Sequence, residues 1–335
     1  MDDADFDAQL RAAIDGKTKP LGALGRIEAL AAQIARLQGT LVPRMDTCTL
    51  VIFAADHGVA AEGLSAFPQA VTVEMVRNFL AGGAAANVFA ATLGAGVQVV
   101  DAGVAGAMPD HPDLIRRPVG RGTANLRHGP AMTPDQAARA LATGAEIARA
   151  APGDALALGE MGIANTSSAA LLLHRLTGVA LERLVGRGTG LDDAGLAHKN
   201  AVLAAASARV PERLSPDAAL AEFGGFEIAM MAGAMQAAAE AHRMVLVDGL
   251  IATSAAAVAL GRAPHIRPAL VFSHRSGDAG HAAALEALEA QPLLDLGMRL
   301  GEGTGALLAW PLLRAAAAML CDMASFDAAG VSRPA

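Results

Sequence analysis

The sequence of 335 residues contains no tyrosine, one tryptophan and nine phenylalanines, so aromatic side chains contribute little to any core. Ala, Leu, Val and Gly dominate instead, and we expect small aliphatic side chains between closely approaching elements. Charged residues make up 18% of the chain, below the usual quarter of a globular protein. With 26 basic and 33 acidic residues, the formal charge is −7. This balance argues against a nucleic-acid binder, which needs a basic surface to neutralise phosphates.

Cysteine is scarce as well. Cys48 and Cys321 lie in apolar stretches, which is typical of buried thiols, and no spacing indicates a disulfide framework or a metal site. Residues 1–5 are acidic, unlike the basic start of a secretory signal. The apolar run 306–323 is interrupted by a proline and two charged residues, so we interpret it as a buried helix and expect no membrane span. These features predict a cytoplasmic protein.

Five short aliphatic runs each end abruptly in polar residues and are followed by Ala-rich helical stretches. They span residues 49–54, 97–100, 155–158, 244–247 and 269–272. Continuous runs without alternation suit strands that are buried on both faces, and strands separated by helices imply a parallel sheet. We therefore predict an α/β fold with a three-layer, Rossmann-like parallel sheet. In such sheets ligands bind beyond the carboxyl ends of the strands, where the polar residues lie here.

The two chain ends carry helical patterns without an adjacent strand. Apolar residues from Leu24 to Leu37 recur at helical spacing after Pro20 and Gly22, and the apolar C-terminal run forms a second helix. We expect a large α/β domain over residues 40–300. A small helical domain would be built from residues 1–39 and 301–335.

A glutamate flanked by glycines, Glu302 in the segment 301–305, opens the C-terminal apolar helix. Glycines expose the backbone to close approach, and apolar neighbours would raise the pKa of the carboxyl group towards that of a usable base. The alternative is a glutamate that is favoured at a helix N-terminus by the helix dipole. From this segment alone both interpretations stay open.

The segment 159–168 follows a predicted strand and leads into a helix, so its backbone N–H groups could hold an anion. Glu160, at the strand end, is the functional candidate of this segment. For Asn165, Thr166 and Ser167 we favour ordinary N-caps of the helix.

Three further signals are weaker. A glycine-rich turn at residues 186–190 precedes Lys199, which suggests phosphate but does not match the Walker pattern. Asp56 and His57 follow the first run and could be a catalytic pair or part of a metal site, but no third ligand is near in sequence. His274 ends the last run, whereas we expect the scattered histidines, His281 among them, to be surface or structural residues.

Taken in order, these segments resemble the nicotinate-nucleotide–dimethylbenzimidazole phosphoribosyltransferases. The matching segments are residues 19–25 (KPLGALG), 56–59 (DHGV), 159–166 (GEMGIANT), 224–227 (GGFE), 246–249 (LVDG) and 298–305 (MRLGEGTG). The resemblance runs from Lys19 to Met323. It implies a large α/β domain, a small helical domain made from both chain ends, and a homodimer.

The resemblance also implies an activity and a set of site residues. Phosphoribose would move from nicotinate mononucleotide to dimethylbenzimidazole, giving nicotinate and α-ribazole phosphate for the nucleotide loop of cobalamin, with no metal and no cofactor. The implied catalytic base is Glu302. The implied phosphoribose and nicotinate contacts are Glu160, Gly162, Ile163, Lys199, Asp248, Ser273 and His274, and the implied benzimidazole contacts are Ser65, Phe67, Pro68, Met75 and Leu300.

The implied reaction needs one base. Nicotinate leaves its nucleotide as a neutral pyridine, whereas the attacking benzimidazole must lose an N–H proton. Three alternatives remain beside it. Another acceptor such as adenine or a phenol would use the same site, and a nucleotide sensor would bind without reacting. A dinucleotide-dependent oxidoreductase is disfavoured because residues 56–58 stand where its G-x-G-x-x-G motif would begin.

Overall fold

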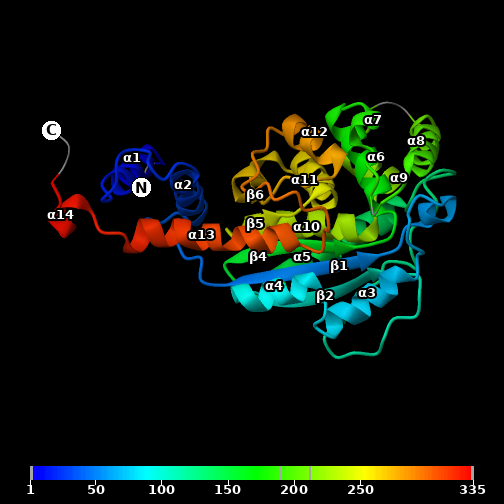
Figure 1. Ribbon diagram of the computed structural model, residues 1–335, viewed down its shortest axis with the longest axis horizontal. Helices are drawn as coiled ribbons and strands as arrows, with labels where there is room; N and C mark the ends of the chain where they lie inside the picture. Colours follow the sequence, from blue (N-terminus) through cyan, green and yellow to red (C-terminus); the bar gives the residue numbers. More distant parts are fainter. Residues whose placement is uncertain (1–2, 189, 211–212, 333–335) are drawn as a thin grey trace.

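The computed structural model describes residues 3–188, 190–210 and 213–332. Six parallel strands form one sheet in the order β3-β2-β1-β4-β5-β6 (Figure 1). Their bounds are β1 (Cys48–Ala55), β2 (Gly96–Gly103), β3 (Leu114–Arg116), β4 (Ala155–Met161), β5 (Met244–Val247) and β6 (Leu270–Phe272). The predicted α/β fold is confirmed, and the five predicted runs lie in strands except for Ala269, which ends η2 before β6. The three-residue edge strand β3 was not predicted.

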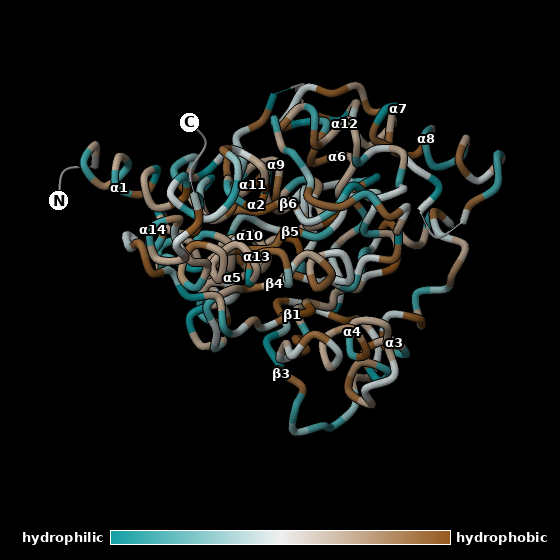
Figure 2. Tube along the Cα trace, turned by 60° about the vertical axis from the view of Figure 1, so that its left-hand side comes forward, coloured by the Kyte–Doolittle hydropathy of each residue, from teal (hydrophilic) through white to brown (hydrophobic). Residues whose placement is uncertain are grey.

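The sheet is buried on both faces, as the continuous aliphatic runs predicted. Along β1, Val51 and Phe53 belong to one hydrophobic cluster, whereas Leu50 and Ile52 belong to the other. All eight residues of β1 are buried. In Figure 2 the most hydrophobic stretches of the trace accordingly gather at the central strands.

Helices cover each face and complete the three layers. The cluster that contains Val51 is shared with α5 (Pro134–Ala150), α6 (Asn165–Thr177), α9 (Pro216–Phe223), α10 (Phe226–Glu240) and α11 (Leu250–Arg262). The cluster that contains Leu50 is shared with α2 (Arg26–Gln38), α3 (Val71–Leu80), α4 (Ala85–Leu93) and α13 (Thr304–Asp322). The remaining helical elements are α1 (Asp3–Asp15), η1 (Gly58–Glu62), α7 (Leu181–Leu184), α8 (Asp193–Ser207), η2 (Pro264–Ala269), α12 (Ala279–Ala287) and α14 (Phe326–Ala329).

Small residues allow these layers to approach closely, which explains a core with so few aromatic side chains. A Cβ added to Gly144 of α5 would lie 1.9 Å from the carbonyl oxygen of Met230 in α10. The same is true of Gly233 of α10 against the carbonyl oxygen of Leu141 in α5. The two backbones are therefore in contact, and α10 is buried along almost its whole length.

The two chain ends lie together. In Figure 1, α1 and α2 lie beside the C-terminal end of α13, and α14 lies beyond that end. Lys17 pairs with Ser325 in an isolated antiparallel bridge. Helix α1 was not predicted. The helix expected to start near Pro20 begins at Arg26 instead, because Gly22 and Gly25 adopt positive φ and form turns before it. The division into domains at residues 39/40 and 300/301 stays a prediction.

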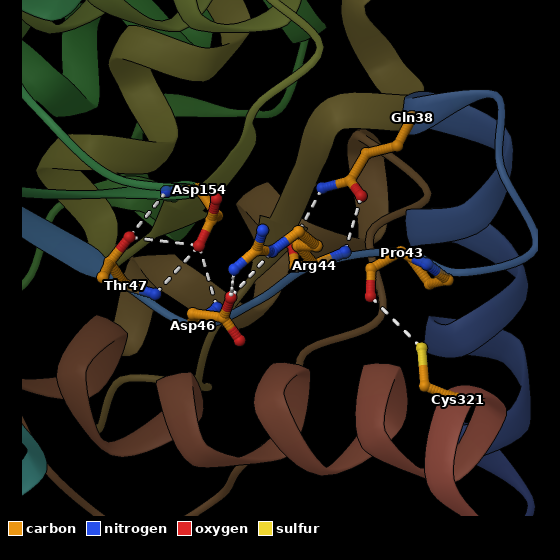
Figure 3. Close-up of polar contacts among 7 residues, drawn as sticks. All are labelled: Gln38, Pro43, Arg44, Asp46, Thr47, Asp154 and Cys321. Atoms are coloured by element: carbon orange, nitrogen blue, oxygen red, sulfur yellow. Dashed lines mark hydrogen bonds and ion pairs between the residues drawn. The ribbon is translucent and has the colours of Figure 1, made fainter.

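A short linker, residues 39–47, joins α2 to β1 and is fixed by polar contacts (Figure 3). Asp154 accepts hydrogen bonds from the backbone N–H groups of Asp46 (2.8 Å) and Thr47 (2.9 Å). Gln38 exchanges two hydrogen bonds with the backbone of Arg44. These contacts fix the path by which the chain enters the central strand.

Helix α13 fits the interpretation of the apolar C-terminal run. Within residues 3–188, 190–210 and 213–332, it is the one helix that is long and apolar enough to cross a membrane by length and composition. In the protein, 61% of its apolar window is buried. Trp310 and Leu313 of α13 belong to the same cluster as Leu50 and Ile52 of the sheet.

The strand order reverses between β1 and β4. After β1 the chain adds β2 and β3 on one side, and then crosses to add β4, β5 and β6 on the other. Ligands of open α/β sheets bind beyond the carboxyl ends of the strands at such a reversal. Here that position is occupied by the residues that follow Ala55 and Met161.

Candidate active site

A pocket of about 300 Å³ opens beyond the carboxyl end of β4, beside the strand-order reversal. Its walls come from the loop before α3, the β4–α6 turn, the segments after β5 and β6, and the turn before α13. It is lined by Leu64, Ser65, Phe67, Val71, Met75, Glu160, Met161, Gly162, Ile163, Ala164, Asn165, Thr166, Gly188, Gly249, Leu250, Ile251, His274, Ser276, Asp278, Arg299, Leu300, Gly301 and Glu302.

Glu302 stands in a tight turn that brings it into this pocket. It adopts a φ of 62°, between Gly301 at 83° and Gly303 at 79°. The turn lies directly on β4, because a Cβ on Gly159 would be 2.5 Å from the carbonyl oxygen of Glu302. A Cβ on Gly305 would be 2.0 Å from the His274 ring. The glycines around Glu302 are thus required by conformation and by close approach.

The Glu302 carboxyl group is suited to accept a proton. The side chain is 6% exposed, and its Oε2 has no hydrogen-bond partner among the described residues. Burial raises the pKa of Glu302. A hydrogen bond from the Ala86 backbone N–H partly offsets this rise. That N–H lies at the start of α4, where the helix dipole favours a carboxylate. The base role of Glu302 stays a prediction, and the helix dipole next to its carboxyl group is that of α4, not that of the helix that Glu302 precedes.

Glu160 is the second carboxyl group of the pocket, at the end of β4. Burial raises its pKa to about 8, with further contributions from the negative charges of Asp248, Glu227 and Glu302. The Asn165 side-chain amide donates a hydrogen bond to Glu160 Oε2 and opposes this shift. A pKa of about 8 favours the protonated form of Glu160 at neutral pH.

The N-cap interpretation of Asn165, Thr166 and Ser167 was wrong. The N-cap of α6 is Ala164, in a left-handed conformation with φ 73°, and it makes no side-chain cap. The tight turn of the chain at the β4 end places the three polar residues inside the first turn of the helix. Two of their side chains reach other partners, Asn165 on Glu160 and Thr166 on Lys199.

Lys199 lies just beneath one end of the pocket. Its Nζ donates to Thr166 Oγ1 (2.8 Å) and to the carbonyl oxygen of Gly186 (3.2 Å), and the side chain is fully buried. Burial lowers the pKa of Lys199 to about 8. The glycine-rich turn passes beside this amine, with Gly188 in the pocket wall; Thr189 of that turn lies outside the described residues. An α-helix N-terminus, a hydroxyl group and an amine therefore converge here, which suits a phosphate.

Asp248 does not line the pocket but holds the turn that does. Its two carboxylate oxygens accept hydrogen bonds from the backbone N–H groups of Gly303 (3.2 Å) and Ala306 (3.0 Å). His274, which does line the pocket, has its Nε2 3.5 Å from Asp248 Oδ1. Asp248 thus ties the end of β5 to the start of α13.

All but one of the residues expected at the benzimidazole end line the pocket. Ser65, Phe67 and Met75 line it, as does Leu300, whereas Pro68 does not. Phe67 is 50% exposed. Exposed apolar side chains such as Phe67 can hold a flat, uncharged ring.

Of the thirteen expected site residues, nine line the pocket. Lys199, Asp248, Ser273 and Pro68 lie outside its lining. Ser273 is fully buried, and its backbone N–H bonds the carbonyl oxygen of Val247, so it continues the β6 pairing behind the site. Its neighbour His274 is the residue that faces the pocket.

Sequence reasoning missed Arg299, Ser276 and Asp278 in the lining. Arg299 stands in the recognised segment 298–305 but received no role, and its guanidinium bonds the carbonyl oxygen of Gly188 (3.3 Å). His281 was expected to be a surface or structural residue, and it is structural. It is fully buried and accepts a hydrogen bond from the Ser276 backbone N–H, which holds this wall (2.9 Å). Burial lowers the pKa of His281 to about 3.

No group of three or more His, Cys, Asp or Glu side chains that could hold a metal ion occurs in the part of the chain that the structure describes. The metal interpretation of Asp56 and His57 therefore has no support. His57 lies between Glu227 and Ser168, fully buried.

A Rossmann-like sheet with buried carboxyl groups, a helix N-terminus and a lysine at its switch point fits the class of phosphoribosyltransferases. The chain matches the family model described as "Phosphoribosyltransferase" over residues 1–331. It is 55% identical to a protein of Cupriavidus taiwanensis, over 99% of this chain and 96% of that protein. A protein of Ralstonia nicotianae is also 55% identical, over 98% and 94% of the two chains.

Both relatives are named nicotinate-nucleotide–dimethylbenzimidazole phosphoribosyltransferase. The crystal structure of CobT from Thermus thermophilus is similar as well, with a TM-score of 0.95 at 49% identity. That comparison covers 98% of this chain and 100% of the other. This chain belongs to the family of nicotinate-nucleotide–dimethylbenzimidazole phosphoribosyltransferases.

Proposed function

We propose that this chain transfers phosphoribose from nicotinate mononucleotide to dimethylbenzimidazole. The products are nicotinate and α-ribazole phosphate, the nucleotide-loop precursor of cobalamin. The family membership supports the reaction. The observation that carries the mechanism is the turn at residues 301–303, which places one buried, partly unpartnered carboxyl group against an apolar wall.

Glu302 is the catalytic base. The unprotonated nitrogen of the benzimidazole attacks the ribose carbon, the bond from that carbon to nicotinate breaks, and nicotinate leaves as a neutral pyridine. The second ring nitrogen then loses its proton to Glu302. A raised pKa makes Glu302 a stronger base than an exposed glutamate, and such help is typically worth ~100- to ~10,000-fold. Phe67, Met75 and Leu300 hold the acceptor ring.

The phosphoribose group occupies the other half of the pocket. Its phosphate lies at the start of α6, near Thr166, Gly188 and Lys199, with Gly162 and Ile163 beside the sugar. Positive charge that develops on the ribose favours the ionised form of Glu160, which in turn stabilises that charge. Asp248 and Ser273 lie outside the pocket lining. Asp248 holds the turn before α13, and Ser273 holds the strand end before His274.

The protein acts in the cytoplasm as a homodimer, with no membrane or nucleic-acid partner. The acidic balance of the chain argues against a nucleic-acid partner and the burial of α13 argues against a membrane span, whereas the homodimer follows from the family resemblance. The helices from both chain ends make up the small domain, residues 1–39 and 301–335, beside the large domain at residues 40–300.

The test is a chromatographic assay of nicotinate and riboside phosphate with purified protein, nicotinate mononucleotide and dimethylbenzimidazole. We expect nicotinate release that depends on the acceptor and that falls at least ~100-fold in Glu302→Gln. Glu289→Gln is the matched control, because Glu289 also has positive φ (50°) but is exposed and away from the pocket.

Two outcomes would change the proposal. Release that persists in Glu302→Gln would keep the reaction and move the base role to another residue, Glu160 first. No release with dimethylbenzimidazole, adenine or a phenol as acceptor would overturn the transferase and favour a sensor of the nucleotide.

A further inference from the structure

One wall of the pocket is formed by an exposed loop, residues 63–70, which joins η1 to α3. Leu64, Ser65 and Phe67 of this loop line the pocket. Within residues 63–70 Leu64 alone is buried, and residues 66–70 are all exposed. A segment with so few buried contacts opens at little cost unless its ends are fixed. The contacts at the two ends of the loop therefore decide how well this wall is formed.

Glu62 fixes the end at which the chain enters the loop. Its Oε1 accepts a hydrogen bond from Asn125 Nδ2 (2.7 Å), and its Oε2 accepts one from Arg127 Nη1. His128 Nε2 lies 3.3 Å from Oε1, and His198 Nε2 donates to the backbone carbonyl oxygen of Glu62 (2.7 Å). The hydrogen bonds from Arg127 and Asn125 lower the pKa of Glu62, so both of its oxygens are acceptors at neutral pH.

The segment that supplies these donors, residues 123–128, is itself held from two sides. On the inner side, a Cβ on Gly58 would lie 2.6 Å from the carbonyl oxygen of Thr123, so η1 is packed directly on this segment. On the outer side, the Arg209 guanidinium donates to the carbonyl oxygens of Leu126 (2.7 Å) and Gly129 (3.1 Å). Glu62 is thus attached to a fixed part of the large α/β layer.

The other end of the loop is attached to a different half of the pocket. Thr72, in the first turn of α3, is fully buried, and its Oγ1 accepts a hydrogen bond from the backbone N–H of Ile163 (3.2 Å). Ile163 belongs to the turn after β4, beside the expected position of the sugar. A change at Thr72 would therefore disturb both substrates, whereas Glu62 contacts the loop end that is remote from this turn. Glu62 itself does not line the pocket.

We propose that Glu62 is a positioning residue for the acceptor, because it holds residues 63–70 in the conformation that receives the benzimidazole without touching that ring. A binding site that is formed only part of the time loses apparent affinity in proportion to that fraction. Loosening the loop at Glu62 should therefore weaken acceptor binding and leave the chemistry at Glu302 unchanged. This inference rests on the proposed function, and its first test needs no substrate.

The first test is backbone hydrogen exchange of the unliganded protein, followed by mass spectrometry. Glu62→Gln keeps the shape of the side chain but turns an N–H₂ group towards one of two donors, Asn125 or Arg127, so residues 63–70 should exchange faster. Glu222→Gln is the matched control. Glu222 and Glu62 have side chains that are each 12% exposed, and Glu222 pairs with Arg209 on the outer side of the same segment. It should leave the exchange of residues 63–70 as in the wild type.

The second test is kinetic. If the formed fraction of the loop falls to about one tenth, the KM for dimethylbenzimidazole should rise ~10-fold in Glu62→Gln. The kcat and the KM for nicotinate mononucleotide should stay unchanged, and Glu222→Gln should keep all three values. Adding Asn125→Asp to Glu62→Gln should restore the acceptor KM, because the new amide then donates to the new carboxylate and the net charge is that of the wild type.

Parallel rises in the KM values of both substrates would overturn the inference and leave Glu62 a general structural role. An unchanged acceptor KM in a folded Glu62→Gln variant would overturn it as well. If that variant fails to fold, Arg127→Ala removes one partner at the surface and should raise the acceptor KM alone; no rise would refute the inference. A wild type that releases no nicotinate would instead refute the proposed function, and the exchange of residues 63–70 would then decide alone whether Glu62 holds the loop.

Discussion

Glu302 adopts a backbone conformation that residues other than glycine rarely take. A left-handed conformation costs roughly 1–2 kcal/mol for an ordinary residue, and such strain persists where the surroundings fix it. Here Asp248 bonds the backbone on one side, and Gly159 lies against the Glu302 carbonyl oxygen on the other. The strain places a carboxyl group at one position in the pocket, which is the requirement for a positioned base.

At Gly301 both conformation and contact resist a side chain, so Gly301→Ala should harm the site. The Cβ would lie 2.4 Å from Glu160 Oε1, at a φ of +83°. We expect a loss of stability of roughly 1–2 kcal/mol and a loss of most transfer activity, measured by urea unfolding and by nicotinate release. Gly94→Ala is the control, with a φ of +68° and no atom within 4 Å. It should lose similar stability and keep its rate; an equal loss of rate in both variants would contradict the contact argument.

The sequence indicated the site residues whose place follows from a strand end or a glycine pattern. Glu160 ends a strand, and Glu302 stands between glycines in the segment that opens α13. Asn165 and Thr166 were misjudged because an N-cap and a buried hydrogen bond use the same residue types. Thr166 meets Lys199 through the tertiary approach of α8, which no local pattern encodes, whereas Asn165 meets Glu160 across the turn that follows β4.

At the scale of elements, long apolar patterns were predictable and short or polar ones were not. The strands β1, β4 and β5 are continuous aliphatic runs buried on both faces. The edge strand β3 has three residues, of which Leu114 alone is buried, and α1 is a largely polar helix that packs on α2 and buries Leu10 and Ile14. Elements fixed by tertiary contacts leave little trace in local sequence.

The position of α13 depends on Asp248, so Asp248→Asn should affect stability and catalysis together. The amide can accept only one of the two backbone N–H groups, and an unsatisfied buried donor costs about 1–3 kcal/mol. We expect a lower urea midpoint and a lower kcat, because the same turn carries Glu302. Asp154→Asn is the comparison, because a single oxygen of Asp154 accepts both backbone N–H groups in the linker to β1, so the amide oxygen can keep both bonds. It should change stability and kcat much less. An unchanged kcat in Asp248→Asn would contradict the expectation that the same turn controls both stability and catalysis.

For the whole molecule, the strand order explains where the site lies. The chain leaves β1 towards β2 and returns to β4 on the other side, so no connection covers the ends of these two strands. The turn before α13 brings Glu302 into this gap, from a part of the sequence far from β1. The fold thereby gathers Glu160, Asp248, Glu227 and Glu302 near one another in the unliganded protein. That concentration of acids should have a cost in stability.

Glu160→Gln should therefore stabilise the unliganded protein against unfolding, and more so at higher pH. The pKa of Glu160 is about 8 in the folded protein, above its ordinary value of 4.5. Its contribution to stability is thus complete below about pH 4.5 and is lost as the pH rises to about 8, because burial penalises the carboxylate. Glutamine carries no charge at any pH and escapes this loss. The free energy of unfolding, measured in urea at pH 5, 6.5 and 8, should favour the variant increasingly, by up to a few kcal/mol. Glu240→Gln, at an exposed site, should show no such trend. A difference between Glu160→Gln and the wild type that stays constant over this range would mean that Glu160 is ionised throughout.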